Sequence, residues 1–114
     1  MGTYINYYAY GKFSEARSYM AKSSKALRQR VAGAYVGWLY IIREDDLPDE
    51  LKEDFASLQK MVTEKPPSNW RGAVEETLVS MHWRRVNKCA ELIVKMADRA
   101  DYLVDPKFDY RRAA

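Results

Sequence analysis

The chain offers few side chains of the kinds that perform catalysis or bind metal ions. It contains one histidine, His82, and one cysteine, Cys89, so neither a histidine-rich nor a thiolate metal site can form within one chain. The phosphate-binding pattern GxxxxGK[ST], the dinucleotide-binding GxGxxG, the metal-binding HExxH and the nucleophile elbow GxSxG are missing from the sequence. We therefore predict a protein that is not an enzyme, with no catalytic residues, no metal site and no cofactor.

The remaining polar candidates each have a simple structural interpretation. His82 precedes the last expected helix, where it would cap the helix or lie on the surface, and Cys89 falls on the apolar face of that helix. The acidic cluster at residues 45–50 lacks the spacing and the glycine of an EF-hand loop and suits the first turn of a helix. Glu75 and Glu76 are adjacent, so on a helix they point about 100° apart and do not form a glycosidase pair.

Basic side chains form a second kind of candidate, a binding site for a polyanion. Phosphate binding needs several Lys or Arg side chains on one surface, and base stacking needs exposed aromatic rings. One basic group lies in the first half of the central expected helix, and another begins the last helix, where Arg84, Lys88 and Lys95 share a face that Glu91 interrupts. The candidate polyanion-binding residues are Lys22, Lys25, Arg28, Arg84, Arg85 and Lys88.

Aromatic residues and two glycines indicate a protein–protein interface instead. Three tryptophans and nine tyrosines are many for a small helical domain, and Trp, Tyr and Arg are the usual anchors of interfaces. Two glycines four residues apart inside one helix cost about 1 kcal/mol each relative to alanine, which indicates that another helix crosses closely there. The candidate interface residues are Tyr4, Tyr7, Tyr8, Tyr10, Gly33, Gly37, Trp70 and Trp83. We predict a protein partner and a homo-oligomer, with nucleic-acid binding as the alternative.

Helices of characteristic periodicity are expected to position these side chains. In the stretch 24–44 the large apolar residues recur at steps of four, four, three and four, which places them on one helical face; they are Leu27, Val31, Tyr35, Trp38 and Ile42. Its wide apolar side predicts a central helix packed on more than one side. Breaks are expected at the serine pair 23–24, at the Pro-containing segments and near residues 80–82. The expected helices span residues 14–22, 24–44, 47–63, 70–80 and 82–103.

These helices predict an all-α fold, a compact antiparallel bundle of four to five helices in one domain of 114 residues. The joins are short, so consecutive helices should pack antiparallel. Ser14 is the expected N-cap of the first helix. Residues 1–12 are expected to form a tyrosine-rich arm that packs on the body or on a second subunit, and residues 105–114 a short tail.

Charge is distributed unevenly along the chain. Residues 1–43 carry a net charge of +6, residues 44–64 of −6 and residues 65–114 of +3. Either the acidic helix lies against basic neighbours in the same fold, or a basic face is kept apart for a polyanion or an acidic partner. The single cysteine allows no internal disulfide, and no apolar run approaches the roughly 20 residues needed to cross a bilayer. We predict a cytoplasmic protein without a membrane partner.

Residues 25–97 resemble small uncharacterised helical proteins of bacteria and their mobile elements. The resemblance rests on the acidic helix start before Leu47-Pro48, the Leu-x-x-x-Phe helix after it and the following Thr-Leu-x-x-Met. These are packing and capping features, so the resemblance implies a compact helical domain and brings no catalytic residues. It further implies a role in host–element conflict or regulation, for example as a regulator or inhibitor from a bacterial or phage conflict system.

Overall fold

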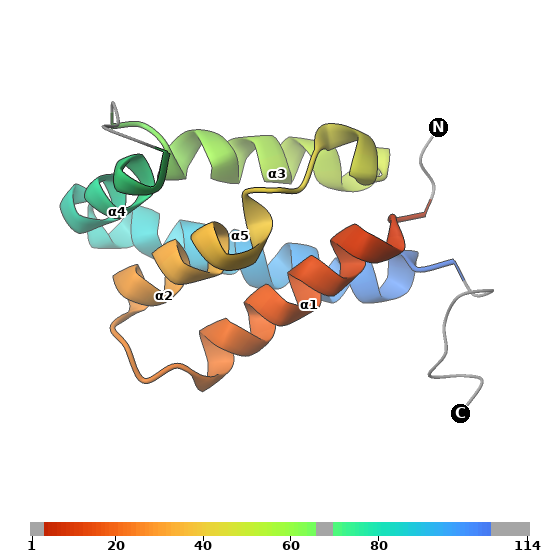
Figure 1. Cartoon of the computed structure of the whole chain (residues 1–114), viewed down its shortest axis with the longest axis horizontal. Helices are drawn as coiled ribbons and strands as arrows, with labels where there is room; N and C mark the ends of the chain where they lie inside the picture. Colours follow the sequence, from red (N-terminus) through yellow and green to blue (C-terminus); the bar gives the residue numbers. More distant parts are fainter. Residues whose placement is uncertain (1–3, 66–69, 106–114) are drawn as a thin grey trace.

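The computed structural model describes residues 4–65 and 70–105 and arranges them as an all-α bundle (Figure 1). Its α-helices are α1 (Tyr7–Lys22), α2 (Leu27–Ala34), α3 (Asp49–Val62), α4 (Trp70–Ser80) and α5 (Trp83–Leu103). A π-helical turn, η1 (Tyr35–Leu39), follows α2, and a 3-10 turn, η2 (Glu44–Asp46), precedes α3. Within the described residues there is no strand. The predicted fold class is confirmed.

The longest helix, α5, shares the centre of the bundle with the stretch 24–44, because each of them packs against three other helices. α5 has 21 residues and contacts α1, α2 and α3, which lie on its near side in Figure 1. Its buried side chains recur at steps of three or one along one face; they are Val86, Cys89, Leu92, Ile93, Met96, Ala97, Ala100 and Leu103. The prediction that the stretch 24–44 is packed on more than one side is confirmed, because α2 contacts α1, α4 and α5, but α5 is equally central.

The stretch 24–44 is also not one continuous helix, because its regular α-helical part ends at Ala34. The Tyr40 N–H donates to the Tyr35 carbonyl at 2.9 Å, five residues back, so the turn is wider than an α-helical one. After it the chain reverses toward η2. The predicted apolar stripe nonetheless holds: Val31, Tyr35 and Ile42 are buried, and Leu27 and Trp38 pack partly buried against the core.

The first helix begins seven residues before the predicted N-cap at Ser14, so residues 7–12 are helix and not an arm. The Asn6 side chain caps α1 by accepting hydrogen bonds from the Tyr8 and Ala9 N–H groups, at 2.7 and 3.3 Å. The buried face starts at Ala9 and continues through Phe13. A small alanine carries little periodic signal, which explains the error. Residues 1–3 of the predicted arm and residues 106–114 of the predicted tail lie outside the described residues.

The N-terminal segment is held against the far end of the chain. The Ile5 N–H donates to the Leu103 carbonyl at 2.9 Å, and Ile5 forms an isolated β-bridge with Val104. The next residue, Asn6, donates its N–H to the Asp46 carbonyl at 3.2 Å. Ile5 is itself buried. We call this contact of Ile5 with α5 the terminal latch.

The remaining helices follow the sequence-based boundaries within about two residues. α3 buries Leu51, Phe55, Leu58 and Val62, the expected stripe. The predicted break at residues 80–82 separates α4 from α5, and His82 caps α5: its Nδ1 accepts the Arg84 N–H at 3.1 Å. The capping interpretation of His82 is therefore confirmed.

Candidate interaction surfaces

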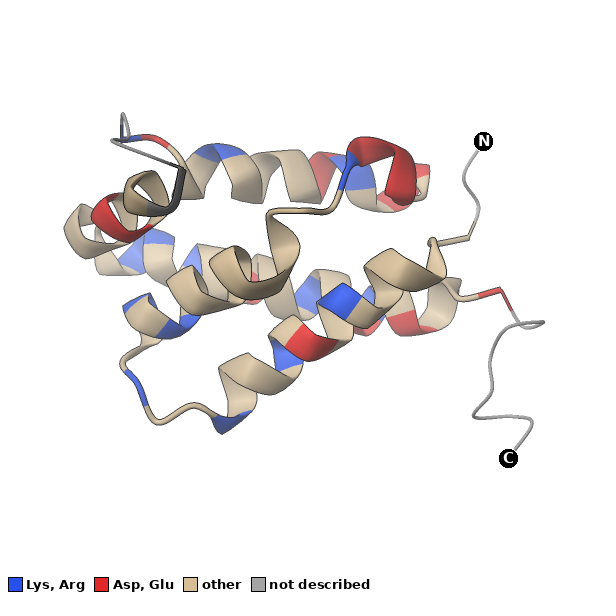
Figure 2. Cartoon of the chain, viewed as in Figure 1, with Lys and Arg blue, Asp and Glu red and all other residues tan. Residues whose placement is uncertain are grey.

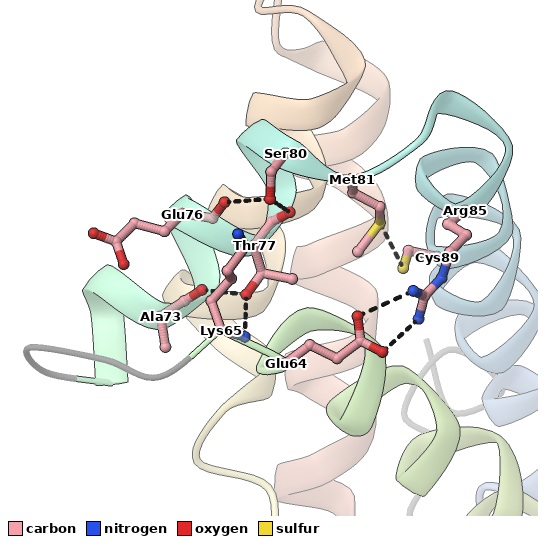
Figure 3. A network of polar contacts seen from close by, with 9 residues as sticks. All are labelled: Glu64, Lys65, Ala73, Glu76, Thr77, Ser80, Met81, Arg85 and Cys89. Carbon is pink, nitrogen blue, oxygen red and sulfur yellow. Dashed lines mark hydrogen bonds and ion pairs between the residues drawn. The ribbon is translucent and has the colours of Figure 1, made fainter.

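Two of the six candidate polyanion-binding residues are used to hold the fold together. Arg28 donates through Nη1 to the carbonyl oxygen of Leu78, at 2.7 Å, and to that of Met81, so it caps the end of α4. Arg85 forms a two-pronged ion pair with Glu64, with both N–O distances at 3.0 Å (Figure 3). This hydrogen-bonded arginine lowers the pKa of Glu64. Both guanidinium groups are therefore already engaged in contacts within the chain.

The other four candidates, Lys22, Lys25, Arg84 and Lys88, are exposed. The structure brings the two basic groups of the sequence toward one another, because Arg28 fastens the start of α2 to the corner between α4 and α5. Lysine and arginine lie at this end of the bundle together with acidic residues of α4, and acidic residues are concentrated at the opposite end, where α3 begins (Figure 2). Four of the six candidate residues are therefore exposed, and their binding to a polyanion stays a prediction.

Trp83 stands at the start of α5 with 57% of its surface exposed. Its ring stacks on His82, with ring centroids 5.7 Å apart and planes inclined by 29°, and the Arg84 guanidinium carbon lies 5.4 Å from the ring centroid. A cation over an indole face is a favourable contact. The result is an exposed aromatic platform beside the basic residues of α5. The other tryptophan candidate, Trp70, has its side chain outside the described part of the structure.

The N-terminal tyrosines form a second exposed aromatic patch, on the first turns of α1. Tyr4, Tyr7 and Tyr8 are each about half exposed. Tyr7 stacks with Tyr10 at a centroid distance of 5.8 Å, and the Lys12 ammonium lies 5.2 Å from the Tyr8 ring centroid. Tyr10 itself is half-buried and packs against the core. Three of the four candidate tyrosines thus lie on the surface.

The two candidate glycines have different surroundings. A Cβ atom on Gly33 would lie 2.5 Å from the Tyr19 hydroxyl oxygen and 2.7 Å from its ring, whereas a Cβ on Gly37 would meet nothing within 4 Å. Tyr19 comes from α1 and is itself packed against Trp38, with ring centroids 5.4 Å apart. The predicted close approach is confirmed at Gly33, but the approaching group belongs to the same chain. At Gly37 the prediction of a tight crossing is wrong.

Ion pairs between α3 and α5 account for much of the uneven charge. Lys95 Nζ lies 3.1 Å from Asp54 Oδ2, Arg99 pairs with Glu50, and Arg85 pairs with Glu64 just after α3. On the other side of α5, Arg17 of α1 bridges Asp98 and Asp101, at 2.8 and 3.0 Å. The acidic helix therefore lies against basic neighbours, as the first interpretation of the charge pattern predicted.

Cys89 is a buried structural thiol, as its position predicted. Burial raises its pKa to about 11. The thiol lies 3.9 Å from the sulfur of Met81 (Figure 3). In the part of the chain that the structure describes, no three His, Cys, Asp or Glu side chains gather in a way that could hold a metal ion.

An open groove of about 830 Å³ runs along the outer side of α5, beside the start of α3. Val94 and Tyr102 are exposed in it, by 38% and 78%. The sequence-based candidates do not include this surface, because they were chosen as basic, aromatic or glycine residues and not by their alignment along α5. The sequence did carry a signal for this surface, the regular spacing of the polar residues of α5. Glu91 is part of that spacing, but it was interpreted as an interruption of the basic face.

Comparisons of the chain with protein-family models, curated proteins and solved structures give no match. Every helix within the described residues is too short or too polar to span a lipid bilayer.

Proposed function

We propose that the protein is a non-enzymatic interaction module that binds another protein and associates with itself. The observation that carries this proposal is the number of large aromatic side chains exposed within the described residues; they are Tyr4, Tyr7, Tyr8, Tyr40, Trp83 and Tyr102. Burying an aromatic side chain removes about 150–250 Å² from water. Such side chains next to arginine are typical anchors of protein interfaces.

The grouping of these residues supports the proposal in addition to their number. Scattered exposed apolar residues are ordinary on soluble proteins. Here Tyr7 and Tyr8 begin α1 and Tyr4 lies three residues before it, and the Arg84 guanidinium lies over the Trp83 ring. Tyr102 likewise lies near a guanidinium, that of Arg99, at 5.9 Å.

The titratable groups with shifted pKa values favour a non-enzymatic role. Arg17, Arg85 and Arg99 have raised pKa values chiefly because each donates to a carboxylate on another helix or loop. Cys89 has a raised pKa because it is buried in the core. Each arginine therefore connects two elements of the fold, and the cysteine fills space in the core. A cytoplasmic location and a role as a regulator or inhibitor in a bacterial or phage conflict system remain predictions.

Sedimentation velocity over a concentration series tests the self-association. The weight-average mass of the wild-type chain should rise with concentration toward that of a dimer. A strictly monomeric chain at high concentration would contradict this part of the proposal. Partner binding is tested by affinity capture from the native host, comparing the wild type with Tyr7→Ser/Tyr8→Ser and Trp83→Ser variants that melt normally. A partner that is retained equally by all three chains would argue against the aromatic anchors.

Nucleic-acid binding is the second candidate function, and the platform at the start of α5 favours it. Trp83 offers an exposed ring for stacking a base, and Arg84 and Lys88 lie beside it. Lys25 lies at the same corner of the bundle through the attachment of Arg28.

Fluorescence anisotropy with labelled single- and double-stranded DNA and RNA at low salt tests this alternative, because phosphate-driven affinity is strongest there. Arg84→Gln/Lys88→Gln should weaken binding and lower the slope of log affinity against log salt by roughly 0.7–0.9 per lost phosphate contact. The matched control is Lys60→Gln, which removes one exposed charge from α3. Absence of binding at low salt would exclude the alternative.

A further inference from the structure

The outward side of α5 carries a regular line of exposed side chains. Their positions follow steps of four, three, four, three and four, which keep them on one line along a helix. The members, which we call the outer stripe, are Arg84, Lys88, Glu91, Lys95, Asp98 and Tyr102. α1, α2 and α3 contact the opposite side of α5, where its eight buried residues lie. Within residues 4–65 and 70–105, the outer stripe is therefore a helix face over which no other helix packs.

The charges of the outer stripe are complementary to those of the same stripe on a second copy that runs in the opposite direction. A two-fold axis midway between Glu91 and Lys95 would place these two residues opposite each other in an antiparallel pair of helices. The same axis places Lys88 opposite Asp98 of the second copy. All of these contacts join opposite charges, and the axis generates each of them twice.

The outermost position of the outer stripe fits the same arrangement. The axis sets Arg84 opposite Tyr102 of the second copy, a cation beside an aromatic ring that is 78% exposed. Val94, 38% exposed, lies beside the outer stripe one residue from the axis, so its two copies meet on one flank of the contact. Both Val94 and Tyr102 line the open groove of about 830 Å³ described above.

The order of charges selects a second copy of this chain over other occupants. A uniformly acidic or basic partner would be repelled by half of the outer stripe, and a parallel copy would place each charge opposite itself. An antiparallel copy also opposes the two helix dipoles favourably. Lys95 and Asp98 already pair with Asp54 and Arg17, but their side chains are 69% and 61% exposed and can accept a further partner.

We propose that two copies of the chain dimerise by packing their α5 helices antiparallel along the outer stripe. This inference rests on the proposed self-association and names the surface that performs it. Exposed ion pairs each contribute little and are screened by salt. The dimer should therefore be weak and should weaken further as salt rises.

Charge reversal tests the register directly. Lys88→Glu sets a glutamate opposite Asp98 in both contacts, and Asp98→Lys sets a lysine opposite Lys88. Each variant alone should dimerise on the order of tenfold more weakly than the wild type at low salt. An equimolar mixture of the two variants should form heterodimers, because both contacts then join opposite charges again. Sedimentation equilibrium measures all three samples, with one variant fluorescently labelled to follow it in the mixture.

Matched variants keep the test interpretable. Lys25→Glu makes the same charge change on an exposed residue that does not belong to the outer stripe and should dimerise like the wild type. Asp98→Lys also loses the contact with Arg17, so its melting is followed by circular dichroism. If it does not fold, the pair Glu91→Lys and Lys95→Glu repeats the mixing experiment.

The outcomes separate the two proposals. Heterodimers that are stronger than either variant's own dimer support the outer stripe. A dimer that both charge reversals leave unchanged would overturn the outer stripe as the interface while leaving self-association intact. A chain that stays monomeric at every concentration and salt, alone and in the mixture, would overturn both.

Discussion

Gly33 is the residue whose small size has the clearest structural reason, because the Tyr19 ring occupies the space where a side chain would begin. Alanine is the better helix former by about 1 kcal/mol, yet Gly33→Ala should lower the free energy of unfolding by about 1–3 kcal/mol, since the ring must leave its contact with Trp38. Urea denaturation measures the change.

Gly11 provides the matched control for this prediction. It lies inside α1, and a Cβ there would meet nothing within 4 Å. Gly11→Ala should therefore stabilise the chain by up to about 1 kcal/mol. Equal stabilisation by Gly33→Ala would show that Tyr19 yields without cost and that the close approach has no energetic weight.

The buried Cys89 thiol makes stability depend on pH in the alkaline range. Its pKa is raised from 9.0 to about 11 by burial, so the thiol contributes stability below pH 9 that is lost as pH rises toward 11, when only the unfolded chain has readily ionised. The difference in melting temperature between the wild type and Cys89→Ala should shrink over this interval. Thermal melts of both chains from pH 7 to 11 measure it.

A second measurement distinguishes burial from other alkaline effects. The folded wild type should react with a thiol reagent far more slowly than the unfolded chain in denaturant, because the thiolate is the reactive form and the side chain is enclosed. Rapid modification of the native chain at neutral pH would contradict the account of Cys89 as a core residue.

Single residues were predictable from the sequence where their role is local. His82 and Cys89 received the right interpretations because a cap and an apolar helical face depend only on neighbours in the chain. Arg28 was interpreted wrongly as a free cation, because the carbonyl groups that accept its hydrogen bonds, those of Leu78 and Met81, lie at the end of another helix. Isolated sequence patterns cannot separate such a cap from a free cation.

At the scale of elements, Thr77 joins the end of the α3 segment to α4. It is the buried polar side chain among the described residues: its hydroxyl donates to the Ala73 carbonyl at 2.6 Å and accepts the Lys65 N–H at 3.0 Å (Figure 3). Thr77→Val keeps the shape but leaves that N–H without its acceptor. We expect a loss of about 1–3 kcal/mol in the free energy of unfolding.

Thr77→Ser is the control, because it keeps the hydroxyl and removes only a methyl group. It should cost clearly less than Thr77→Val in the same chemical denaturation experiment. If valine proved as stable as threonine, the Lys65 N–H must find another acceptor, and the attachment between the two elements would not depend on Thr77.

Helix boundaries were predictable where proline or a clear stripe marks them, and not where the backbone departs from the regular period. The start of α3 follows Pro48, and the stripe from Leu51 to Val62 is unbroken. The π-helical turn Tyr35–Leu39 keeps Tyr35 and Leu39 buried while changing the spacing. An apolar stripe in the sequence therefore continues past the point where the regular helix ends.

At the scale of the whole molecule, the sequence predicted the class of fold and a central stretch at 24–44, but not that α5 is equally central. Both 24–44 and 82–103 carry wide apolar faces, and only the structure shows how many helices each one contacts. The charge pattern was predictable in the same limited way: it indicated that basic and acidic segments would meet, and Lys95–Asp54 and Arg99–Glu50 show where. The surface that we propose for dimerisation required knowing which face of α5 is left uncovered.

The terminal latch has a consequence for the order of folding. Its contact of Ile5 with Leu103 and Val104 joins nearly the two ends of the described chain, so closing that loop early would cost much entropy before other contacts support it. Ile5→Ala should therefore accelerate unfolding while leaving the refolding rate almost unchanged. Stopped-flow kinetics in urea would measure both limbs, and slowed refolding with unaltered unfolding would place the latch in the folding nucleus. We therefore expect the contact of Ile5 with Leu103 and Val104 to form late in folding and to break early in unfolding.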